Sequence, residues 1–172
     1  MRKIHMESVK IILLSVALAV GYGVLHDQVT ARVCVEYFTI GHPPVFPTTS
    51  PTWLAIGWGI IATWWAGAIV GIPLAVAARA GRRPTRSAHQ LLRPGLCLLG
   101  GMGMAALAAG SIGYGLARAG QVWLLEPIAS WVPKEKHALF LADWWAHTAS
   151  YASGFLGGIV LCLWVWRKRG RS

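Results

Sequence analysis

The sequence predicts an all-α, polytopic integral membrane protein folded as a bundle of four transmembrane helices. Two observations concern composition: 55% of the 172 residues belong to the apolar set AVILMFWYC, and only 13% are charged. A soluble domain carries about 25% charged residues, and a disordered chain has far less apolar surface. The third observation is a set of uncharged stretches that approach or exceed the roughly 20 residues that a helix needs to cross the hydrocarbon core.

Each expected element follows from these stretches, and together they form a single membrane domain, residues 1–172. The four spans are expected at about 9–27, 53–78, 94–117 and 138–166. The first span could continue to residue 38, because no helix breaker precedes Gly41. Between the spans we expect a proline-rich outer loop at 39–52, a basic inner loop at 79–93 and an outer interfacial segment at 119–137.

The first span has a second interpretation. A basic start at Arg2 and Lys3 followed by a short apolar run is also typical of a secretory signal peptide. We expect the segment to be retained as a transmembrane helix.

The distribution of basic residues predicts that both termini are cytoplasmic. Twelve of the 16 Lys and Arg residues lie before the first span or in its first turn, between the second and third, or after the fourth. Five of the six acids lie on the opposite side. Because basic residues stay on the cytoplasmic side, we expect a multi-pass protein of the cell membrane, specifically a cell inner membrane. The net charge of +10 is then explained by contact with anionic lipids of the inner leaflet, and no nucleic-acid partner is expected.

Small residues recur at every fourth position along the spans, as in Ala19 and Gly23 of the first and Gly59 and Gly67 of the second. Small side chains let helix backbones approach closely in lipid. The pattern predicts tight packing within one bundle, in a homo-oligomer, or against subunits of a larger membrane complex, and it does not separate the three.

Ionisable residues within the spans point to function, because each costs about 2.5–3.5 kcal/mol at a helix centre. Asp143 and His147 lie four residues apart, hence on one face of the fourth span. Topology brings other polar residues to the same outer half of the bundle. The expected cluster contains His26, Asp27, Glu36, His42, Arg118, Asp143, His147 and Tyr151.

Imidazoles and carboxylates together form a ligand set that suits a divalent metal such as zinc, iron or manganese. The preferred ligands are His26, Glu36, Asp143 and His147. The same groups could instead bind a proton, or form a structural network in which acids pair with histidine or with nearby arginines. The first functional hypothesis is therefore a small membrane protein that binds a cation, either a divalent metal or a proton.

Two further functions stay open, so the sequence does not decide whether the chain is an enzyme. A metal here could activate water in a membrane enzyme that acts on a lipid or a surface substrate, with His147 or Glu36 as general base. The chain has no GxSxG or HExxH motif that would strengthen that hypothesis. A chain with most of its mass in the membrane could also be an accessory or assembly subunit of a larger complex.

Overall fold

The computed structural model describes residues 2–169, with side chains from Met6 onward, and every regular element in that range is helical. Met1 and residues 170–172, which include the basic Arg171 counted above, lie outside the described residues. The elements are α1 (Arg2–Val33), α2 (Glu36–Thr39), α3 (Pro51–Ile61), α4 (Trp64–Arg79), α5 (Ala88–Arg118), α6 (Ile128–Trp131), the 3-10 turn η1 (Lys134–Lys136) and α7 (His137–Lys168).

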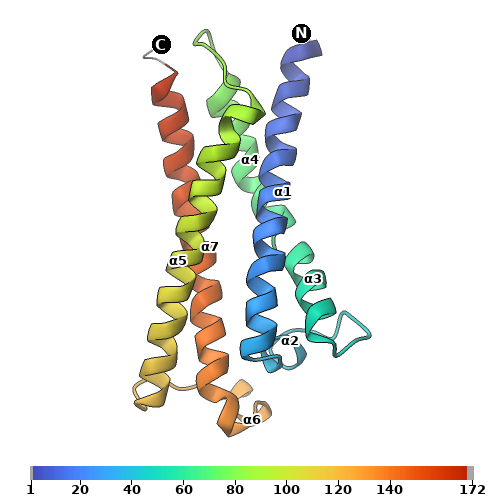
Figure 1. Cartoon of the computed structure of the whole chain (residues 1–172), viewed down its shortest axis with the longest axis vertical. Coiled ribbons are helices and arrows are strands. Elements are labelled where there is room, and N and C mark those ends of the chain that lie inside the picture. Colours follow the sequence, from blue (N-terminus) through green and yellow to red (C-terminus); the bar gives the residue numbers. More distant parts are fainter. Residues whose placement is uncertain (1, 170–172) are drawn as a thin grey trace.

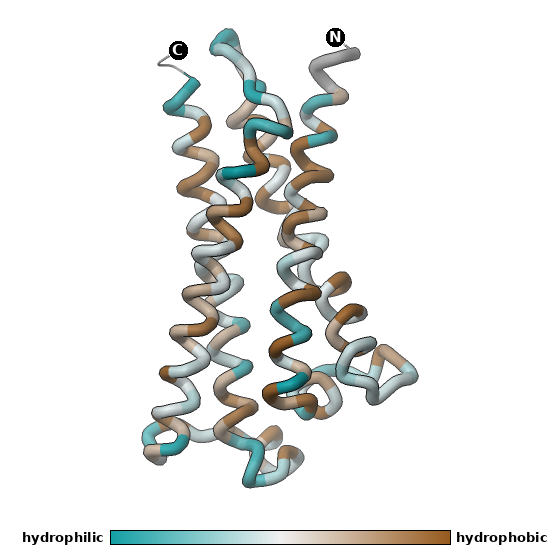
Figure 2. Tube along the Cα trace, in the orientation of Figure 1, coloured by the Kyte–Doolittle hydropathy of each residue, from teal (hydrophilic) through white to brown (hydrophobic). Residues whose placement is uncertain are grey.

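Four helical stretches of the described chain are long and apolar enough to cross a membrane, which confirms the all-α class and the number of candidate spans. They are Met6–Val33, Pro51–Arg79, Ala88–Arg118 and Lys134–Lys168. In Figure 2 the hydrophilic colour is strongest at the two ends of the bundle, whereas apolar residues dominate the shafts of the helices.

The bundle is elongated, with both ends of the chain and the turn at 80–87 at one end, and α2 and α6 at the other (Figure 1). Helix α5 packs along α7, while α1 packs along α3 and α4. Contacts of α4 with α7 and of α1 with α5 join these two halves. The basic segments that the charge pattern assigns to one side thus lie at one end of the bundle.

The structure differs from the predicted helices at two places: the first helix ends before residue 38, and the second is interrupted. Helix α1 stops at Val33, so the first span does not continue to residue 38, and α2 is a separate turn. The second span is interrupted between α3 and α4. There the hydroxyl of Thr63 donates to the carbonyl of Gly59 at 2.5 Å, and the backbone N–H of Thr63 turns to Ile60 instead. A side-chain hydroxyl that competes for a helix carbonyl in this way weakens the helix locally.

Close packing of small residues holds α1 against α3 and α4. A Cβ atom added to Gly59 would lie 2.5 Å from the backbone nitrogen of Val24, and one added to Gly67 would lie 2.7 Å from Cα of Val16. The prediction that small residues mediate close approach is therefore confirmed for this pair of spans. On α5 the pattern does not hold throughout, because nothing lies within 4 Å of a Cβ at Gly101.

Buried side chains form two apolar clusters, one near each end of the bundle. The cluster beside α2 includes Phe38, Ala55 and Phe140, whereas the cluster near the chain termini includes Ile11 and Val165. A cavity lies between these clusters, and its lining includes Phe38 of one and Leu74 of the other.

Arg169 joins α4 and the loop after it to the end of α7, at the end of the bundle where the chain termini lie. Its side chain is fully buried and donates to the carbonyl oxygens of Ala77 (2.5 Å), Ala80 (2.9 Å), Arg83 (3.0 Å) and Pro84 (2.6 Å). These carbonyls belong to the last turn of α4 and the loop after it, where a helix leaves acceptors unsatisfied and favours positive charge. One of the basic residues that the sequence assigns to topology thus also has a structural role.

Candidate metal centre

Three potential ligands meet near the α2 end of the bundle. Helix α1 supplies His26 and Asp27, and α7 supplies His147. Nε2 of His147 lies 3.2 Å from Oδ1 of Asp27, and its Nδ1 lies 3.4 Å from Nε2 of His26. With one ligand atom taken from each residue, all three atoms lie within 4.8 Å of one another. The side chain of Asp27 is 6% exposed and that of His147 15%, so the group is shielded from the surroundings.

The hydrogen bonds assign the tautomer of His147. Its Nδ1 lies 2.8 Å from the backbone carbonyl oxygen of Asp143, one turn earlier on α7. A carbonyl oxygen only accepts, so Nδ1 carries the proton and donates it. In neutral imidazole the other nitrogen, Nε2, is then a lone-pair acceptor, and it faces the acceptor oxygen of Asp27.

Two acceptors at 3.2 Å require a cation between them or beside them, either a proton or a metal ion. Histidines that bind metals characteristically donate their other ring N–H to a backbone carbonyl or a carboxylate, which fixes the ring and its tautomer. The contact from His147 to the Asp143 carbonyl has this form. Bonds of about 2.0–2.2 Å to a central ion place neighbouring ligand atoms roughly 3.2–3.6 Å apart, and the 3.2 Å between Nε2 of His147 and Oδ1 of Asp27 lies in this range.

Asp143 adds a second buried carboxyl group. The residue is 4% exposed, and its Oδ2 atom has no hydrogen-bond partner. Among the residues that the structure describes, neither Asp143 nor Asp27 forms an ion pair with a lysine or arginine. Burying carboxylates without a compensating cation is costly, so two ionised carboxylates here would need a divalent ion to balance their charge.

Helix α2 and the loop after it cover the group. The ring of Tyr37 stacks on His147 with centroids 4.5 Å apart, and Nδ1 of His42 donates to the Tyr37 carbonyl at 2.8 Å. Burial raises the pKa of the Tyr37 hydroxyl, and the nearby carboxylates of Asp143 and Asp27 raise it further. Burial also lowers the pKa of His42, which favours the neutral ring. Both groups are therefore neutral at physiological pH, and neither supplies the missing positive charge.

A second layer of hydroxyl groups lies deeper in the bundle. The hydroxyls of Tyr22 and Ser150 are 2.7 Å apart and link α1 to α7, and Tyr22 stacks on His26 with centroids 5.6 Å apart. The hydroxyl of Tyr151 donates to the carbonyl of Ala62 at 2.8 Å. That carbonyl lies at the break between α3 and α4, so the interruption of the second span is satisfied by a side chain of the fourth.

The four ligands preferred from the sequence are not all gathered in the group. His26 and His147 belong to it, and Asp143 lies one turn from His147, with its backbone carbonyl bound to that ring. Glu36 has other neighbours: its carboxylate accepts a hydrogen bond from the thiol of Cys34 at 3.3 Å and lies 3.9 Å from Nζ of Lys136. Burial and the Glu36 hydrogen bond raise the pKa of the Cys34 thiol to about 12.

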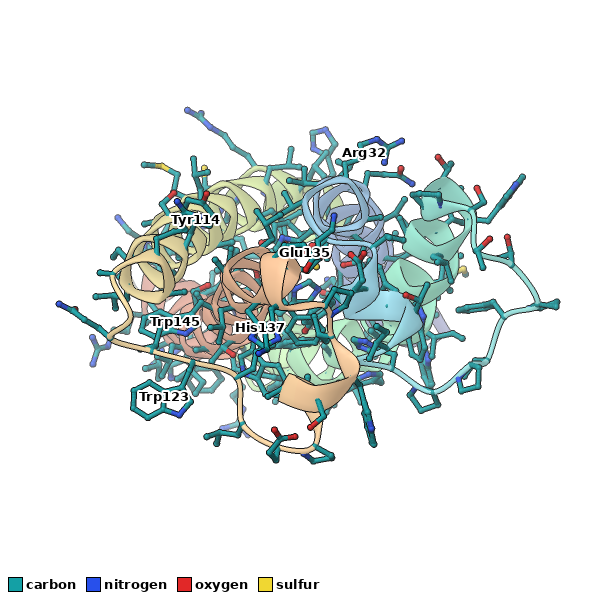
Figure 3. The ribbon with its side chains drawn as sticks, turned by 90° about the horizontal axis from the view of Figure 1, so that it is seen from below. Arg32, Tyr114, Trp123, Glu135, His137 and Trp145 are labelled. Atoms are coloured by element: carbon teal, nitrogen blue, oxygen red, sulfur yellow. The ribbon has the colours of Figure 1, made fainter. Side chains whose placement is uncertain are left out.

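The arginines that might have paired with the acids lie elsewhere. Figure 3 looks onto this end of the bundle. It shows Arg32 at the outer edge of α1, on the opposite side of the bundle from Trp123. Its guanidinium donates to the side chain of Gln28 at 2.6 Å and to its carbonyl at 2.8 Å. Arg118 is exposed at the end of α5. The network of acid–arginine pairs considered from the sequence is not formed by these two residues.

Sequence reasoning included Asp27 in the polar cluster but did not select it as a ligand, and it did not identify Tyr37 or Tyr22. Tyr22 precedes His26 by four residues, so helical spacing could have revealed that contact. Tyr37 carried no such signal, because its position over His147 depends on the end of α1 at Val33 and the turn into α2. Comparisons of the chain with protein-family models, curated proteins and solved structures give no match.

Proposed function

We propose that this protein is a small integral membrane protein that binds a divalent metal ion through His26, Asp27 and His147. The facing acceptors of His147 and Asp27 carry this proposal, because they need a cation between them. Two histidines and one carboxylate are a known ligand set for zinc with water as the fourth ligand, and for iron(II) in oxygenases. Asp143 is a candidate for a fourth ligand or for a group that balances the charge.

A metal ion explains more of the site than a bridging proton does. One proton between Asp27 and His147 leaves the buried Oδ2 atom of Asp143 without a hydrogen-bond partner and gives His26 no role. A divalent ion matches the two carboxylates in charge and uses both imidazoles. Three protein ligands also leave such an ion a coordination position for water or another oxygen ligand.

The orientation of the protein is part of this proposal. The basic end, with the chain termini and the turn at 80–87, faces the cytoplasm and the anionic lipids of the inner leaflet, so the metal site lies in the outer half of the cell membrane. Fusion of a reporter that is active only outside the cytoplasm to the C-terminus tests this orientation. An active reporter would contradict it.

Metal analysis of the purified full-length chain tests the function directly. The protein, carrying an affinity tag without histidine, is expected to retain stoichiometric zinc, iron or manganese, and His147→Ala is expected to lose it. His89→Ala is the matched control, because this exposed histidine lies at the other end of the bundle on α5. Equal metal content in His147→Ala and the parent chain, or no metal in either after reconstitution, would refute the proposal.

A further inference from the structure

A cavity runs from the metal centre into the middle of the bundle. Its volume is about 170 Å³, and we call it the apolar slot. It is lined mainly by aliphatic and aromatic side chains of α1, α4, α5 and α7, among them Leu14, Leu18, Val70, Leu98, Met102 and Phe155. The apolar slot occupies the space between the two buried clusters.

The two ends of the apolar slot differ in chemistry. One end is formed by Asp27, Tyr37 and His147, so it opens onto the candidate metal centre. The other end is lined by aliphatic residues that include Leu74 and Leu91, both buried. On α1 the lining extends from Leu14 to Asp27, which is about 20 Å of helix. A long cavity with a polar head end and an apolar tail end has the shape of a single hydrocarbon chain.

The dimensions of the apolar slot and the charges beside it restrict its occupant to one chemical class. The apolar slot is about 20 Å long and partly open to its surroundings, so it can take a slender chain, whereas an α-helix is about 10 Å wide and does not fit. No lysine or arginine lines the apolar slot, and two buried acids lie at or beside its polar end. A phosphate or carboxylate head would therefore add uncompensated negative charge. A neutral oxygen head, such as a hydroxyl or carbonyl group, could instead become the further ligand of the metal ion.

We infer that the apolar slot binds a single-chain lipid with a neutral oxygen head group, a fatty alcohol or aldehyde, with that oxygen at the metal centre. The inference rests on the proposed metal site and names the class of ligand that the site takes. Because a neutral head adds no negative charge beside the buried acids, the site is suited to bind this class of lipid in preference to the fatty acid.

Photolabelling of the full-length, zinc-loaded chain tests the inference. The probe is hexadecanol with a diazirine in the middle of its chain, and the adducts are mapped by mass spectrometry. Adducts are expected on lining residues such as Leu18 and Leu98. Excess unlabelled hexadecanol should reduce the labelling roughly tenfold, while the same concentration of palmitate should leave it nearly unchanged.

Two matched variants separate slot binding from general contact with lipid. Leu98→Trp fills the slot and should reduce labelling there roughly tenfold. Leu96→Trp lies two residues away on the same helix, where the parent leucine is 51% exposed, and should label like the parent chain. Ala66→Phe obstructs the slot from α4, so the test does not depend on one variant folding. Zinc content, measured on each variant, reports whether the site itself is intact.

Each outcome bears on one of the two proposals. Zinc-loaded protein with adducts only on exposed side chains such as Leu96 would overturn the slot inference and leave the metal proposal standing. Equal competition by palmitate and hexadecanol would overturn the choice of a neutral head group. Labelling of the slot in a chain that binds no metal after reconstitution would overturn the proposed function instead.

Discussion

Replacing Asp27 by asparagine should raise the stability of the metal-free protein and abolish its stabilisation by metal. In the parent chain without metal, Nε2 of His147 faces an acceptor oxygen at 3.2 Å. An asparagine amide can donate a hydrogen bond to the same nitrogen. Without metal, the parent must either take up a proton between these acceptors or leave a buried acceptor unsatisfied, which costs about 1–3 kcal/mol. We therefore expect the metal-free variant to unfold at a temperature a few degrees higher than the metal-free parent.

With added metal, the parent chain should unfold at a higher temperature than Asp27→Asn. A ligand at a hundredfold excess over its Kd stabilises the native state by about 2.7 kcal/mol, which corresponds to a rise in Tm of about 5–11 °C for a chain of this size. Asp27→Asn lacks one of the three ligands and should show little of this rise. The ten tryptophans make intrinsic fluorescence in detergent a suitable assay, run with a chelator and then with zinc. A metal-induced rise in Asp27→Asn as large as in the parent would refute the ligand assignment.

The remaining predictions concern packing and the edge of the site. Arg169→Ala should destabilise the chain by about 3–5 kcal/mol, because it leaves four carbonyls without their charged donor. Arg167→Ala, at an exposed position near the end of α7, should change Tm little, and equal effects of the two changes would contradict the structural role of Arg169. Gly59→Ala should clash with α1 and destabilise the chain by about 1–3 kcal/mol, which lowers Tm, whereas Gly101→Ala, in open space, should raise Tm slightly. Glu36→Gln should leave metal content unchanged, since Glu36 pairs with its own neighbours; metal loss in this variant would restore Glu36 as a ligand.

Composition and charge were sufficient to predict the general architecture. Uncharged stretches located four spans because lipid allows only closed backbone hydrogen bonding, and small residues marked the contact of α1 with α3 and α4. The break between α3 and α4 was missed because it depends on the Thr63 hydroxyl and on a donor from α7, Tyr151, which lies 89 residues along the chain from Ala62. A hydropathy value averaged over many residues does not register such single contacts.

The candidate site was predicted in part, for a similar reason. The helical spacing of Asp143 and His147 gave their shared face, and topology brought His26 to the same end. The choice between Asp27 and Glu36 could not be made from the sequence, because it depends on where α1 ends. With the helix ending at Val33, Asp27 remains beside His147 while Glu36 turns toward Lys136.

The most direct test of the central claim is the X-ray absorption spectrum of the purified, zinc-loaded chain at the metal edge. The structure predicts a spectrum with the outer-shell scattering of two imidazole rings and first-shell nitrogen and oxygen at about 2.0–2.1 Å. In His147→Ala the imidazole scattering should fall by half or the metal should be lost, and His89→Ala should match the parent. A spectrum without imidazole scattering, or one unchanged by His147→Ala, would contradict a metal site at His26, Asp27 and His147.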